Sequence, residues 1–170
     1  MIVCALVAGL IWSVLWSIYV FLILKLYPWT MLHDYPKDIQ EASKLDKPTE
    51  KQDRSAKLFG AVGGLIIFGV LLAFGLFHFY EERVSFLEVL KYIFITAMTW
   101  NVVDLLVMDW LIICTLTPKW VVIKGTDGCK GYKEHFFYFK GFLIGCVYTT
   151  IMAFMFAGID YAILRFLIWK

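Results

Sequence analysis

Residues 2–26 read IVCALVAGLIWSVLWSIYVFLILKL, and this stretch decides what kind of fold the chain can form. Lys25 is its only charged residue. About 20 helical residues span the roughly 30 Å hydrocarbon core of a bilayer. The stretch lacks the alternation of barrel strands, and backbone groups in lipid must bond within their own segment, so we expect a transmembrane helix. The apolar run is too long for a secretory signal, and no small-residue cleavage site follows it, so we expect this helix to be retained.

Three further stretches of the same kind follow, at about residues 58–80, 86–116 and 136–169. The whole chain is 61% hydrophobic and 18% charged, whereas soluble domains are about 45–50% apolar and about 25% charged. The sequence therefore predicts an all-α, polytopic membrane protein. We expect one domain over residues 1–170, a compact bundle of four transmembrane helices at about 2–26, 58–80, 86–116 and 136–169.

The orientation in the bilayer is predicted from lysine and arginine, which are enriched in cytoplasmic loops. Most of the basic residues fall in or beside two long connections, at about residues 28–57 and 117–135. The opposite side has only Arg83, Lys91, Arg165 and Lys170. We therefore expect both long loops in the cytoplasm and both termini outside, in a plasma or inner membrane.

Small residues recur at helical spacing and predict where the helices meet. Ala5, Gly9, Ser13 and Ser17 are each four residues apart in the first stretch. Small residues mark close helix contacts in lipid, where packing and polar contacts drive association. Gly141 and Gly145 have the same spacing in the fourth stretch, although a single GxxxG is a weak signal because glycine is common in membrane helices.

The third stretch carries polar groups at its centre, where residues 99–110 read TWNVVDLLVMDW. Asn101, Asp104 and Asp109 would share one face of an α-helix about 140° wide. One aspartate at the centre of a membrane helix costs about 2.5–3.5 kcal/mol on insertion scales. Such groups should face the bundle interior or a water-filled cavity, so we take these three as candidates for binding a proton, an ion or a substrate.

On α-helical geometry Asp104 and Asp109 lie about 7.5 Å apart along the axis. At 100° per residue they also point about 140° apart. We therefore expect two separate stations, one near the middle of the membrane and one nearer the cytoplasm, and not a pair of carboxyls that share one proton.

Five further polar residues are candidates because the predicted topology places them near the membrane ends. His78 and Asp160 lie toward the outer side and would continue the set of binding residues on the third stretch. His33, Asp34 and His135 lie at the cytoplasmic face, where the two long loops would form a polar lid over Asp109.

The sequence leaves any cofactor and any metal of this chain unknown. Cys4, Cys114, Cys129 and Cys146 form no CxxC pair, so neither a redox motif nor a tetrahedral metal site is suggested. Neither a P-loop nor an HExxH helix is present. A net charge of +2 and the absence of RNA-binding aromatic motifs argue against a nucleic-acid partner.

Three functions remain open, and whether the protein is an enzyme is one of the open points. The first is a small oligomeric transport or conduction protein for protons or cations, which uses Asp104, Asn101 and Asp109. The second is a membrane-embedded enzyme acting on a lipid or isoprenoid, with acid–base groups within reach of one site. The third is an accessory subunit of a larger membrane complex. The expected partners are the lipid bilayer and either further copies of the chain or another membrane protein.

Overall fold

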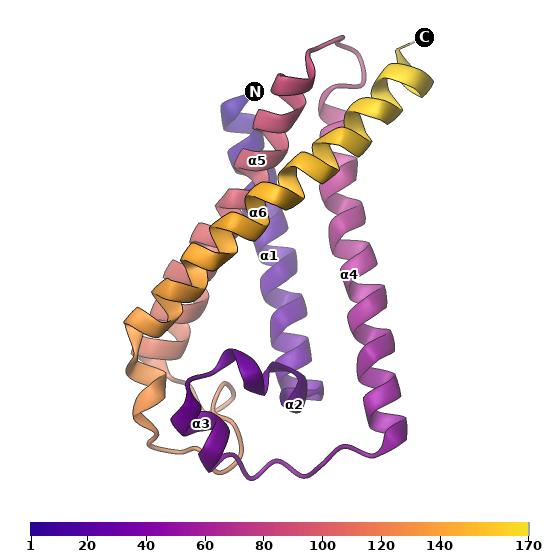
Figure 1. The fold of residues 1–170 in the computed structure, drawn as a ribbon. Coiled ribbons are helices and arrows are strands. Elements are labelled where there is room, and N and C mark those ends of the chain that lie inside the picture. The colour runs from indigo at the N-terminus through magenta and orange to yellow at the C-terminus, as the bar shows by residue number, and fades with distance from the viewer. Residues whose placement is uncertain (170) are drawn as a thin grey trace.

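The computed structural model describes residues 1–169, and over this range it is all-α without a strand. Four long helical segments build the fold (Figure 1). They are α1 (Ile2–Leu26), α4 (Glu50–His78), α5 (Phe86–Val103) with its continuation η2 (Asp104–Leu116), and α6 (His135–Ile163) with its continuation η4 (Leu164–Ile168). Each of the four is long and apolar enough to cross a membrane. The predicted all-α bundle of four membrane-length helices is confirmed.

Polar caps decide where two of the helices begin. α4 starts at Glu50, ahead of the predicted Leu58, because the Thr49 N–H donates to Gln52 Oε1 at 2.9 Å and the Gln52 N–H donates to Thr49 Oγ1 at 3.3 Å. Ser85 and Glu88 form the same reciprocal pair at the start of α5. A capping box satisfies backbone donors that the first helical turn leaves free. Hydropathy locates the apolar span, whereas the cap locates the first helical residue.

Helix α5 is central to the bundle, because it packs along both α1 and α6, which hardly contact each other. α6 crosses the bundle obliquely and reaches α4 near the chain termini (Figure 1). At the opposite end, which we call the loop end, α1 and the start of α6 stand apart.

The small residues of α1 form its contact with α5, as predicted. Ala5, Gly9 and Ser13 are buried. Thr96 Oγ1 of α5 donates to the Ala5 carbonyl at 3.2 Å, and a Cβ added at Gly9 would lie 2.6 Å from Thr99 Cβ. The two backbones therefore approach more closely than larger side chains would allow.

Helix α4 is tied to α1 by two aromatic donors. Trp12 Nε1 donates to the Ile67 carbonyl at 2.9 Å, and the Tyr19 hydroxyl donates to the Gly60 carbonyl at 2.8 Å. Trp12 is fully buried, so this hydrogen bond lies within the interface between the two helices.

The two long loops fold together at the loop end. They contain α2 (Pro28–Met31), η1 (Leu32–Asp34), α3 (Lys37–Ala42) and η3 (Lys130–Lys133). Tyr35 and Ile39 of the first loop share a core with Ile123 and Tyr132 of the second. Asp38 Oδ2 accepts from the Gly131 N–H at 2.8 Å. We call this combined unit, residues 28–49 and 117–134, the loop cap.

Candidate functional site

A cavity of about 710 Å³ lies at the loop end, between α1, η2, α6 and the loop cap. Small-molecule sites in proteins occupy about 300–1,000 Å³ and combine apolar walls with a few placed polar groups. Trp16, Phe21 and Trp100 are among the aromatic walls here. Because α1 and α6 hardly contact each other, the cavity is flanked by two helices that leave a gap between them.

The candidates on the third stretch meet in this cavity. Asn101, Asp104 and Asp109 all line it. From Asp104 onward the chain is π-helical, so its backbone hydrogen bonds join residues five apart. Residues five apart in such a helix lie about one turn from each other on the same side. The expectation that Asp104 and Asp109 point about 140° apart was therefore wrong, because it assumed α-helical winding.

Neither of these two carboxylates is paired with a protein group. Across residues 1–169, no side-chain hydrogen bond or ion pair involves Asp104 or Asp109. Both side chains are only partly buried. Their oxygens are therefore free to interact with whatever occupies the cavity.

Lys133 of the loop cap holds the far end of η2. Its ammonium donates to the Cys114 carbonyl at 2.6 Å, to the Thr115 carbonyl at 3.3 Å and to Thr117 Oγ1 at 2.7 Å. The last carbonyls of a helix have no partner within it. Lys133 supplies such partners and connects the loop cap to the helix that carries the carboxylates.

Asn101 lies at the inner end of the cavity, against α6. Its amide nitrogen donates to Cys146 Sγ at 3.3 Å. A Cβ added at Gly145 would lie 2.6 Å from Asn101 Oδ1, whereas one added at Gly141 meets nothing within 4 Å. The two glycines thus have different roles. Gly145 admits the Asn101 side chain, and Gly141 leaves open space in the cavity wall.

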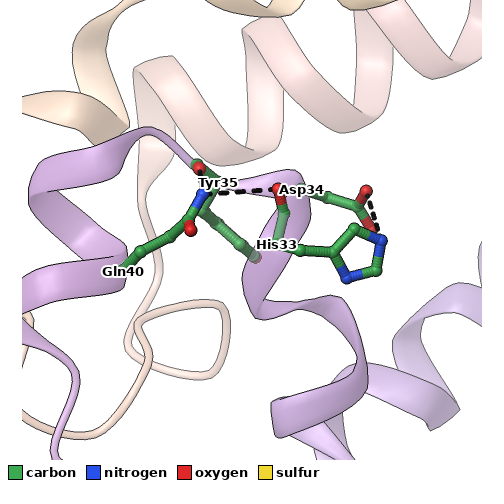
Figure 2. Close-up of polar contacts among 4 residues, drawn as sticks. All are labelled: His33, Asp34, Tyr35 and Gln40. Carbon is green, nitrogen blue, oxygen red and sulfur yellow. Dashed lines mark hydrogen bonds and ion pairs between the residues drawn. The ribbon is translucent and has the colours of Figure 1, made fainter.

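The loop cap contributes His33, Asp34 and Tyr35 to the cavity. Figure 2 shows these three residues with Gln40. His33 Nε2 lies 3.2 Å from Asp34 Oδ1. Gln40 of α3 donates to the Tyr35 carbonyl at 2.6 Å and to the His33 carbonyl at 3.4 Å. Gln40 therefore holds the short helical turn that presents the His33–Asp34 pair.

Burial changes the proton affinity of two of these groups. Partial desolvation raises the pKa of the Asp34 carboxyl, although 51% of its side-chain surface is exposed, and the nearby His33 partly opposes this effect. Burial, with Tyr132 close by, also raises the pKa of the Tyr35 hydroxyl. The Tyr35 hydroxyl therefore stays protonated to a higher pH than that of an ordinary tyrosine.

Sequence reasoning missed most of the other lining residues, among them Trp16, Trp100, Tyr138 and Lys140. The rings of Trp16 and Trp100 stack, with centroids 5.4 Å apart. The Tyr138 hydroxyl is buried without a partner among the described residues. Tyr138 resembled an ordinary interfacial aromatic and Lys140 an ordinary flanking cation, so no local pattern separated them from residues that only anchor a helix in a membrane.

Three predicted site residues lie outside the cavity. His135 begins α6, where its Nδ1 lies 3.1 Å from the Lys133 carbonyl and its own carbonyl accepts from Trp110 Nε1. His78 is at the terminal end of the bundle and stacks on Tyr92, with ring centroids 4.3 Å apart. Asp160 is also distant from the cavity, because it packs against Gly75 where α6 meets α4.

Asp160 is fully buried, and neither of its carboxyl oxygens has a hydrogen-bond partner within residues 1–169. An unpaired carboxyl inside a protein is costly, and in membrane helices such residues are usually turned to the bundle interior. Asp160 has that interior position, and it lines neither the cavity described above nor two smaller pockets.

Over residues 1–169, no three histidine, cysteine or acidic side chains are grouped as metal ligands would be. Comparisons of the chain with protein-family models, curated proteins and solved structures find no match. The cavity and the groups that line it are therefore the features that bear on function.

Proposed function

We propose that this chain is an integral membrane protein whose loop cap faces the cytoplasm and whose termini face outside, in a plasma or inner membrane. The support is the excess of lysine around the two long loops, since basic residues are retained on the cytoplasmic side. In that orientation the cavity is in the cytoplasmic half of the bilayer.

We further propose that the protein is a carrier for an amphipathic organic cation. The observation that supports this most directly is the pair of unpartnered carboxylates, Asp104 and Asp109, in a cavity with aromatic walls. An organic cation would pair its charge with these carboxylates and its apolar part with the stacked rings of Trp16 and Trp100. Aromatic faces also attract cations directly.

The cavity has an excess of acidic groups. Asp34 adds a third carboxylate, and it is accompanied by His33. Lys140 is exposed, and its ammonium lies 4.7 Å from the Phe136 ring centroid. It forms no ion pair with the cavity carboxylates. This balance favours a positively charged occupant over an anionic one.

A carrier fits this bundle better than a continuous pore. Between the cavity and the termini the bundle is filled by a packed core that includes Trp12, Ala97 and Ala153, all fully buried. Close-packed protein interiors leave few voids larger than a water molecule. A cavity that is closed on one side suits binding followed by a conformational change.

Equilibrium dialysis tests the binding step with matched probes. The purified protein in nanodiscs should bind tetraphenylphosphonium, after subtraction of empty nanodiscs, and not tetraphenylborate, an anion of nearly the same shape. The double variant D104N/D109N should lose at least about tenfold in affinity, which corresponds to about 1.4 kcal/mol. D160N is the control, because it changes a membrane carboxyl outside the cavity.

Two results would overturn the proposal: equal binding of both probes, or unchanged affinity in D104N/D109N. The carrier step needs a separate assay. Ethidium should enter DNA-loaded proteoliposomes faster with the wild-type protein than with D104N/D109N. If ethidium entry does not depend on the protein, the chain binds organic cations without moving them.

A second candidate function is a membrane-embedded enzyme, and one observation favours it. His33, Asp34 and Asp109 line a single cavity, and acid–base chemistry needs its groups to be within reach of one site. Asp34 would orient the His33 imidazole as a general base. Mass spectrometry of lipids incubated with the wild-type protein should then reveal a product that H33Q does not form, and absence of any product rejects this function.

A further inference from the structure

A second groove lies beside the cavity, at the junction of α1 with the second loop. Its volume is about 480 Å³. Phe21 and Leu24 of α1 form one wall, and Trp120 packs edge-on against Phe21 with ring centroids 4.7 Å apart. Trp120 is 56% exposed. The groove therefore presents an open apolar surface where the first membrane span ends.

Two lysines line the same groove. Lys25 is in the last turn of α1, and Lys124 follows Ile123 in the loop cap. Both are exposed. The end of a membrane span lies at the level of the lipid headgroups, so the two ammonium groups are at the height where lipid phosphates are found.

One acidic group competes for this site. Asp46 Oδ2 lies 3.2 Å from the Lys124 ammonium, and the Asp46 side chain is 91% exposed. An ion pair exposed to this extent contributes little. A phosphate that enters the groove can therefore displace Asp46 from Lys124.

We propose that this groove binds one anionic phospholipid, with its phosphate between Lys25 and Lys124 and an acyl chain along Phe21, Leu24 and Trp120. The combination of two cations at headgroup height with an apolar wall below them matches the charge and shape of such a lipid. The site differs from the acidic cavity, which selects the opposite charge, and its existence does not depend on what the cavity binds.

Native mass spectrometry tests this with mixtures of phosphatidylglycerol and phosphatidylcholine of identical acyl chains. The wild-type protein should retain phosphatidylglycerol preferentially. A basic residue near an anionic headgroup contributes about 1 kcal/mol, so K25Q and K124Q should each lower that preference about fivefold. D46N should raise it, because the competing carboxylate is removed.

The controls separate loss of the site from loss of the fold. K25R/K124R should keep the preference, since the charge is retained. K57Q should leave it unchanged, because Lys57 pairs with Asp53 on α4 outside the groove. An unchanged lipid preference in K25Q/K124Q overturns the proposal. So does displacement of phosphatidylglycerol by millimolar inorganic phosphate, which would make this a site for free phosphate.

Discussion

Gly75 is the position at which one added methyl group should most clearly disturb the packing of α4 against α6. Gly75 is buried, and a Cβ built there would overlap Asp160 Oδ2 and lie 2.9 Å from Ile93 Cδ1. Both neighbours are fully buried, so neither has free space to move into. G75A should therefore destabilise the bundle.

The magnitude follows from two opposing effects. Alanine is favoured over glycine in a helix by about 0.8–1.0 kcal/mol, whereas overpacking a filled interior costs about 1–3 kcal/mol. We expect a net loss of up to about 2 kcal/mol in the free energy of unfolding. G69A is the matched control on the same helix, because Gly69 is exposed and an added Cβ meets nothing within 4 Å. It should gain up to about 1 kcal/mol.

Equilibrium unfolding in mixed micelles with increasing dodecyl sulfate, followed by circular dichroism, measures both variants. A double-mutant cycle identifies the clash: D160A should reduce the cost of G75A, with a coupling of about 0.5–3 kcal/mol. If G75A proves as stable as G69A, or if D160A does not change its effect, the close packing of Asp160 against Gly75 is refuted.

Two further predictions concern the α1–α4 interface and the cavity wall. W12F removes the donor to the Ile67 carbonyl and should lower the free energy of unfolding by about 1–2 kcal/mol. W29F should lower the free energy of unfolding by less, since Trp29 Nε1 has no partner among the described residues. Equal losses in W12F and W29F would mean that the Trp12–Ile67 hydrogen bond does not stabilise the α1–α4 interface. G141A adds a methyl group to the cavity wall and should weaken tetraphenylphosphonium binding by about fivefold without lowering stability. Unchanged affinity in the dialysis assay would mean that the probe binds elsewhere.

Much of the fold could be predicted because the decisive signals are local. Long apolar runs require helices in lipid, and the small residues of α1, such as Ala5 and Gly9, indicated a contact face that the structure confirms. The start of α4 was placed too late because the prediction followed hydropathy, whereas Thr49 and Gln52 set the first turn through a cap.

The candidate site was predicted in part. Asp104, Asp109 and Asn101 stood out because polar groups in a membrane span need an interior position, and His33 and Asp34 line the same cavity. His78, His135 and Asp160 were also plausible from their place along the chain, but whether they share a site depends on distances between helices. Those distances do not follow from any local pattern.

The chain's own residue order was enough to establish four membrane-length helices and to identify the acidic face of the third. The reason is that the free energy of transferring side chains and backbone groups into lipid is large and depends on the residues of a single segment. Which groups share a cavity was decided by packing. The π-helical winding after Val103 differs from the α-helix that the sequence pattern predicted. The separation of α1 from α6 and the folding together of the two loops depend on contacts between segments far apart in the chain. These contacts bring Asp104, Asp109 and His33 to one cavity and leave Asp160 buried between α6 and α4.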